Sequence, residues 1–139
     1  MSLEADILNK YRNIAVIGAS SNPERPSHGV VSYLMKHGYH VMPVNPNEQK
    51  IFGKTSYPNL SSIPEKVEVV DIFRKSEEVM PIVDEAIKIG AKVVWMQEGV
   101  INEEAAAKAR DAGLLVVMDK CMRKQHISLM RRKKRKNGG

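Results

Sequence analysis

The residues best suited to chemistry lie in the stretch VIGASSNPERPSHG, residues 16 to 29. An apolar run ends there at Gly18. Two hydroxyl residues, Ser20 and Ser21, follow, and Arg25 comes just before a helical pattern begins. Backbone amides at a helix start attract anions, hydroxyls add donors, and the planar arginine fork pairs with phosphate. The stretch therefore predicts a phosphate-binding turn; a glycine that only packs and serines that only cap a helix are the alternative interpretation.

Two familiar phosphate-binding motifs are missing from the chain. It contains neither GxxxxGK[ST] nor GxGxxG, which argues against a P-loop nucleotidase. Folds that bind NAD usually place an acid at the end of the second strand, where it meets the ribose hydroxyls. Here that end reads PVNPNEQK, residues 43 to 50, with Asn45 and Pro46 at the place of the acid. The pattern disfavours NAD and leaves ligands with a phosphorylated ribose, including NADP and coenzyme A (CoA).

These residues must be positioned by apolar runs that alternate with helical patterns. The runs are rich in valine and isoleucine, as in strands covered on both faces. They cover residues 13 to 18, 40 to 45, 67 to 73, 91 to 96 and 114 to 118. The alternation predicts a three-layer α/β fold with a Rossmann-like, doubly wound parallel sheet of five strands in the order 3-2-1-4-5. Ligands bind such sheets at the carboxyl ends of the strands, where the order reverses.

The helical patterns have recognisable ends. Ser27 is the predicted N-cap of a first helix that stops before Gly38. A second pattern stops before Gly90, a third runs from Asn102 to Gly113, and a last one runs from about residue 119 to 130. Between the second and third strands the chain reads as turns because glycine, proline and asparagine recur there.

The positive charge of the chain is concentrated at its carboxyl end. The formal net charge is +6, and residues 131 to 139 hold six of the 22 basic residues and no acid. Residues 1 to 130 therefore carry 16 basic and 16 acidic residues. We predict one globular domain, residues 1 to 130, and a disordered basic tail, residues 131 to 139. The neutral domain argues against nucleic acid as a partner, apart from weak contacts of the tail.

Length and composition are typical of a cytoplasmic protein. A chain of 139 residues suits one domain. Cys121 is the single cysteine, so no intrachain disulfide forms. The start, MSLEADILNK, carries acids where a secretory signal needs a basic and then an apolar segment. No stretch approaches the ~20 apolar residues of a membrane-spanning helix.

Three longer stretches carry a family resemblance. They read IGASSNPERPSHGV, LMKHGYHVMPVNPNEQKIFGKTSYPNLSSIPEKVEVVDIFRKSEEV and VVWMQEGVINEEAAAKARDAGLLVVMDKC, and they fall within residues 10 to 125. These stretches resemble the small CoA-binding proteins, which are similar to the N-terminal CoA-binding domain of the succinyl-CoA synthetase alpha subunit. The resemblance implies a Rossmann-like fold and CoA as the ligand.

The resemblance also implies a role for each matched position. The turn after the first strand would meet the pyrophosphate, and the end of the second strand would border the adenosine half. The segment after the third strand would flank adenine and its ribose phosphate, and the turn after the fourth would lie beside the pantetheine arm. In that order the residues are Gly18, Ala19, Ser20, Ser21 and Arg25; Pro43, Val44 and Asn45; Phe73, Arg74 and Lys75; and Gln97 and Gly99. For Phe73, core packing is the alternative.

The sequence predicts no catalytic residue and no metal site. Succinyl-CoA synthetases use a phosphorylated histidine from outside this domain, so the resemblance brings none to this chain. None of the four histidines has another histidine or a carboxylate residue at the spacing that is typical of metal ligands. Cys121 follows the fifth strand among basic residues, which can lower a thiol pKa. A mixed disulfide with the ligand thiol is one interpretation of Cys121, and a structural cysteine is the other.

The leading hypothesis is a stand-alone module that binds CoA or acyl-CoA without a catalytic centre of its own. Such a module would work with a partner protein or as a homo-oligomer. Two alternatives stay open at this point. One is an NADP-type oxidoreductase or sensor domain on the same fold, and the other is a nucleic-acid-associated protein that uses its basic tail.

Overall fold

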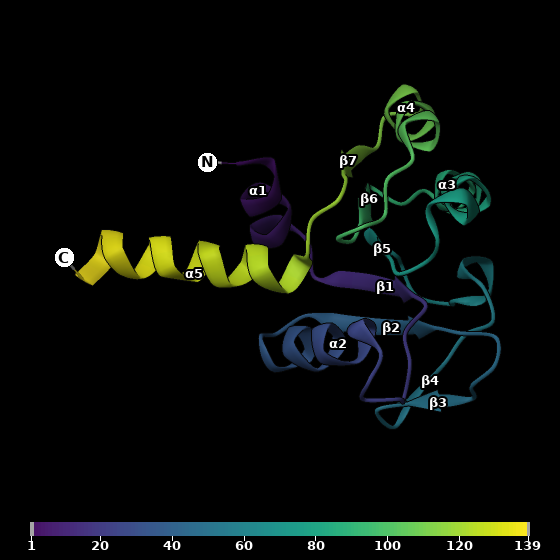
Figure 1. The fold of residues 1–139 in the computed structure, drawn as a ribbon, viewed down its shortest axis with the longest axis horizontal. Helices are drawn as coiled ribbons and strands as arrows, with labels where there is room; N and C mark the ends of the chain where they lie inside the picture. The colour runs from purple at the N-terminus through teal and green to yellow at the C-terminus, as the bar shows by residue number, and fades with distance from the viewer. Residues whose placement is uncertain (1, 139) are drawn as a thin grey trace.

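The computed structural model describes residues 2–138, which form a five-stranded parallel sheet between two layers of helices (Figure 1). The strands of this sheet are β1 (Asn13–Ile17), β2 (His40–Val44), β5 (Val69–Ile72), β6 (Val93–Met96) and β7 (Leu115–Val117). All residues of β5 and β6 are buried, which explains their almost continuous apolar sequence. The three-layer, Rossmann-like α/β fold is confirmed.

The position of one strand corrects the predicted order. The sheet runs β2-β1-β5-β6-β7, so the third predicted strand pairs with β1 and does not lie outside β2. The place outside β2 is filled by a single parallel bridge between Val44 and Tyr57. From that edge the elements follow one another as the Tyr57 bridge, β2, β1, β5, β6 and β7. If the bridge is counted as the third strand, the first five have the order 3-2-1-4-5, and β7 is a sixth strand. The sequence around Tyr57 hides this strand because it contains turn residues instead of an apolar run.

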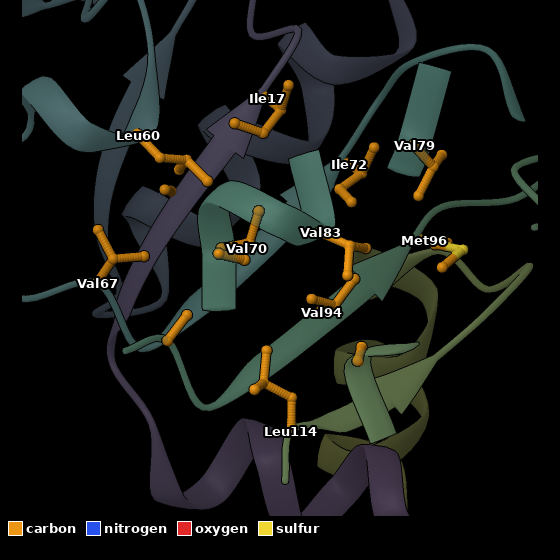
Figure 2. Packing of buried hydrophobic residues seen from close by; sticks show 14 of the residues in the cluster. Ile17, Leu60, Val67, Val70, Ile72, Val79, Val83, Val94, Met96 and Leu114 are labelled. Carbon is orange, nitrogen blue, oxygen red and sulfur yellow. The ribbon is translucent and has the colours of Figure 1, made fainter. Parts of the chain in front are cut away.

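Alternate residues of the strands serve the two helical layers. One layer holds α3 (Val79–Lys88), α4 (Glu103–Asp111) and the 3-10 turn η1 (Leu60–Ser62). Figure 2 shows this side, where Val83 of α3 lies over Val70 and Val94 of the sheet. The other layer holds α1 (Leu3–Lys10), α2 (Pro26–Lys36) and the first half of α5 (Met122–Gly138). The neighbouring strand residues face this second layer, and so do Val30, Phe73 and Cys121 of the site described below.

The connections between elements match the sequence in part. The third helical pattern starts at Asn102 as predicted, and Asn102 caps α4: its side chain accepts a hydrogen bond from the amide of Ala105 at 2.9 Å. Ser27 is not an N-cap: α2 begins one residue earlier, and the Ser27 hydroxyl donates to the carbonyl of Gly18 at 2.8 Å. The segment after β2 is a small antiparallel hairpin of β3 (Lys50–Ile51) and β4 (Lys54–Thr55). A short 3-10 turn, η2 (Ser76–Glu78), precedes α3.

The carboxyl-terminal helix differs from its prediction. The sequence predicts a helix that ends at Met130 and a disordered tail from residue 131 to 139. In the structure α5 continues to Gly138 and projects past the sheet (Figure 1). Lysine and arginine have high helix propensity, and Lys133 donates to the Asn9 side chain of α1 at 2.7 Å. Residue 139 lies outside the described residues, and the division into a domain and a tail stays a prediction.

Within residues 2–138, no helix is both long enough and apolar enough to cross a membrane.

Candidate functional site

A cavity of about 810 Å³ opens at the carboxyl edge of the sheet, around the point where the strand order reverses between β1 and β5. Its walls come from the turn after β1, the ends of β5 and β6, and the start of α5. The lining residues are Gly18, Arg25, Pro26, Ser27, Val30, Phe73, Arg74, Lys75, Glu78, Gln97, Glu98, Val100, Cys121, Arg123, Lys124 and Ile127. This volume falls in the range of small-molecule sites, and its position is where such sheets bind ligands.

The structure brings six of the predicted binding residues together in this cavity. They are Gly18, Arg25, Phe73, Arg74, Lys75 and Gln97. The other seven predicted residues do not line it: Ala19, Ser20, Ser21, Pro43, Val44, Asn45 and Gly99. The buried members of this second group belong to the core, and the polar members make hydrogen bonds within the protein. The contacts that the resemblance implies for all thirteen residues stay predictions.

The protein backbone itself requires glycine at position 18. Gly18 has a φ of +86°, and a Cβ atom added there would lie 2.2 Å from the carbonyl oxygen of Phe73. The ends of β1 and β5 approach this closely because the amide of Phe73 donates to the carbonyl of Ile17 at 2.9 Å. Packing therefore accounts for this glycine before any ligand is considered. Gly18 also lines the cavity.

An acid occupies the turn that was predicted to hold phosphate. Glu48 accepts hydrogen bonds from both the amide and the hydroxyl of Ser21, and the Asn45 side-chain amide donates to it at 3.3 Å. The bonds from Ser21 lower the pKa of Glu48. The end of the second strand still carries Asn45 and Pro46 at the place of the acid, but an acid from the loop that follows reaches this turn. Glu48 lies three residues beyond Asn45 and folds back over the turn, which the linear sequence does not show.

The cavity carries an excess of positive charge. Seven charged side chains line it, and we call them the rim: Arg25, Arg74, Lys75, Arg123 and Lys124 against Glu78 and Glu98. Lys124 Nζ lies 2.9 and 3.1 Å from the two carboxylate oxygens of Glu98, and this bond raises the pKa of Lys124. Setting that pair aside leaves four cations and one acid on the rim. Such a surface favours an anionic ligand.

The start of α5 supplies part of the wall that the sequence reasoning did not assign to the site. Arg123, Lys124 and Ile127 lie on one face because their spacing is that of adjacent helical turns. Tyr33 of α2 holds this helix in place. Its hydroxyl lies 2.7 Å from Nδ1 of His126, and the Arg123 guanidinium lies 5.4 Å from its ring centroid. The helical spacing just after the fifth strand was the signal that could have identified these residues.

Cys121 lines the same cavity and is partly buried. Its basic neighbour in the sequence, Lys120, turns away and forms an ion pair with Glu4 of α1. Arg123 and Lys124 of α5, which begins one residue later, share the cavity wall with the thiol. The redox interpretation of Cys121 stays a prediction.

A buried acid lies in the sheet below the cavity. Asp71 of β5 is fully buried, and its Oδ1 accepts a hydrogen bond from Nε2 of Gln97 at 2.5 Å. Its second oxygen, Oδ2, has no hydrogen-bond partner among the described residues. Burial raises the pKa of Asp71 to about 7. The sequence places Asp71 in a predicted strand, but its hydrogen bond to Gln97 was not predicted.

The described part of the chain offers no cluster of three or more His, Cys, Asp or Glu side chains for a metal ion.

Fold and cavity together define a Rossmann-like domain with a basic cavity at the switch point of its sheet. The sequence matches the family described as "CoA binding domain" over residues 12–127, and the chain belongs to this family. The resemblance to the small CoA-binding proteins is thereby confirmed.

Relatives of this chain include stand-alone proteins and parts of larger enzymes. It is 35% identical to "Uncharacterized protein YneT" of Bacillus subtilis over 87% of this chain and 90% of that protein. It is 33% identical to "Acetate–CoA ligase [ADP-forming] I subunit alpha" of Pyrococcus furiosus, over 68% of this chain but 21% of that subunit. A solved structure, "hypothetical protein from Pyrococcus horikoshii OT3", is similar with a TM-score of 0.89 and 46% identity, covering 91% and 89% of the two chains.

Proposed function

We propose that this protein binds CoA or acyl-CoA in the cavity at the carboxyl edge of its sheet, as a module without a catalytic centre of its own. The observation that carries the proposal is the basic rim on a family-typical CoA-binding domain. CoA carries a pyrophosphate and a ribose phosphate, so its charge complements the four cations that remain after the Lys124–Glu98 pair is set aside.

The shape and chemistry of the wall support the same ligand. The cavity combines the cationic rim with apolar side chains such as Val30, Val100 and Ile127. An apolar wall suits the adenine ring and the alkyl parts of the pantetheine arm, and the rim suits the phosphates. Phe73 lines the cavity from the end of β5 and offers a ring face for adenine.

Isothermal titration of ligand-free protein tests this proposal. We expect CoA to bind more tightly than dephospho-CoA, because the ribose phosphate meets the rim, and more tightly than NADP. A change of Lys75 to Gln should weaken CoA binding, and the loss should be larger at low salt, where a charge at the surface is least screened. Lys92→Gln is the matched control, because Lys92 is exposed and does not line the cavity.

Three results would overturn the proposal. The first is a folded wild-type protein that binds no CoA at hundreds of micromolar. The second is a preference for NADP over CoA, which would favour the oxidoreductase or sensor alternative. The third is an equal loss of affinity in the Lys75 and Lys92 variants, because CoA would then bind away from the rim.

A further inference from the structure

The burial of the Asp71 carboxyl group has a free-energy cost that its position in the sheet does not explain. It belongs to a central parallel strand, where its register neighbours are Val16 of β1 and Trp95 of β6. Apolar residues are the rule in such strands. A buried carboxyl group with one unpartnered oxygen is unfavourable, because it has lost its hydration without a full set of hydrogen bonds. An apolar side chain would remove this cost, so the carboxyl group has another use.

Gln97 connects this carboxyl group to the cavity. Its Nε2 donates to Asp71, and the Gln97 side chain lines the cavity while remaining almost fully buried. Among the described residues, Oε1 of Gln97 has no protein hydrogen-bond partner, and it is not among the fully enclosed unpartnered atoms. The bond to Asp71 therefore turns the NH2 group of the amide toward the sheet and leaves its oxygen for the cavity.

No other charged group controls Asp71 in this part of the protein. The seven rim residues and Cys121 surround the cavity, from the turn before α2, from the segments after β5 and β6, from η2, and from the start of α5 with the residue before it. None of them makes a hydrogen bond or an ion pair with Asp71 in the described chain. On the side of α1, Glu4 is paired with Lys120. The state of Asp71 is thus set by burial and by Gln97.

We propose that Asp71 is a positioning residue: through Gln97 it makes the cavity select a ligand group that donates a hydrogen bond, and this selection depends on the ionisation of Asp71. The ionised carboxylate only accepts hydrogen bonds, so it fixes the Gln97 amide in one orientation. A neutral carboxyl group can also donate, so the amide is free to turn and offer its NH2 group instead. The selected donor is of the amide N–H or hydroxyl class, which occurs along the pantetheine arm.

Proton linkage follows from this arrangement. Because burial raises the pKa of Asp71 to about 7, both forms are populated near neutral pH. A ligand that needs the ionised form must lower that pKa, and binding then releases protons. The inference rests on the proposed function, because its ligand is of the CoA type.

Dephospho-CoA is the probe that tests the inference, because the monoester phosphate of CoA would itself titrate near pH 6. Titration calorimetry between about pH 5.5 and 8, in buffers of different ionisation enthalpy, gives affinity and proton release. If only the ionised form binds, wild-type affinity rises by about thirtyfold over this range, because affinity scales with the competent fraction. Asp71→Asn should bind with a flat pH profile and release no protons. Asp84→Asn, an exposed acid on α3, should behave like wild type.

A measurement on wild-type protein tests the inference even if the Asp71 variant fails to fold. The carboxyl carbon of Asp71 in wild-type protein can be followed by NMR, and its titration midpoint should fall when dephospho-CoA saturates the site. An unchanged midpoint, or the same pH profile for wild type and a folded Asp71→Asn protein, overturns the inference while leaving CoA binding intact. If wild-type protein binds neither CoA nor dephospho-CoA at any pH, the proposed function fails, and this inference fails with it.

Discussion

Replacement of Asp71 by asparagine should change how the stability of the unliganded protein depends on pH. Asparagine keeps the size of the side chain and can still accept from Gln97, but it does not titrate. The folded-state pKa of Asp71 is raised from its ordinary value of 3.8 to about 7. A raised pKa contributes stability that is fully present below pH 4 and is lost as the pH rises through 7.

The magnitude follows from these two pKa values. Between pH 8 and pH 5 the folded wild-type protein gains about 3 kcal/mol from proton uptake by Asp71, because each pKa unit is worth about 1.4 kcal/mol. The asparagine variant gains nothing from this group. At pH 8 the variant should therefore be more stable relative to wild type than it is at pH 5, by about 3 kcal/mol.

Urea denaturation followed by circular dichroism at about pH 5, 6, 7 and 8 measures this difference. The comparison of two chains cancels the other titrating groups. Among these is His126, whose pKa is lowered by burial and whose protonation destabilises the fold at low pH. Stability curves for wild type and variant that run parallel from pH 5 to pH 8 would refute the reasoning, because Asp71 would then titrate outside this range.

Three further predictions concern the first turn and the basic helix. Gly18→Val should lower the yield of folded protein rather than only weaken binding, because its Cβ would lie 2.2 Å from the carbonyl oxygen of Phe73; a normal thermal melt would contradict this. Glu48→Gln should strengthen CoA binding modestly, because it removes a negative charge that solvent partly screens at the turn predicted to hold the phosphates. Unchanged affinity in calorimetry would show that the phosphates lie away from this turn. Binding of RNA or DNA, if measurable, should be lost in a chain that ends at Met130 and should fall steeply with salt in the full chain. Equal salt-sensitive binding by both chains would place the polyanion site elsewhere.

The fold was predictable because its strands have a strong and repeated signal. Runs such as VEVVDIF and AKVVWM contain valine and isoleucine without a helical period, and glycines mark the ends of the helices between them. The strand order was less accessible. The third apolar run pairs with β1 and not with β2, and the single bridge at Tyr57 that lies outside β2 comes from a turn-like sequence without a periodic signal. The extent of α5 was also missed, because charge repulsion predicts disorder while helix propensity favours a helix.

Those residues of the candidate site that stand directly after a strand were predictable. Gly18, Phe73 and Gln97 stand just after β1, β5 and β6, so a parallel sheet brings them to one edge. Glu48 and the residues of α5 reach the turn and the cavity through the path of a loop and the packing of a helix. Neither the path of that loop nor the packing of that helix can be predicted from the local sequence. The Asp71–Gln97 contact joins two strands, and its importance depends on burial, which a single sequence does not give.

Backbone NMR of the 15N-labelled, ligand-free protein tests the central claim most directly. Addition of CoA should shift the amide signals at the carboxyl edge of the sheet, above all those of Gly18, residues 73 to 75, Gln97 and Arg123. The hairpin of β3 and β4 and the opposite edge of the sheet should keep their signals. Shifts confined to that opposite edge or to the end of α5, or no shifts with CoA at hundreds of micromolar, would contradict CoA binding in this cavity.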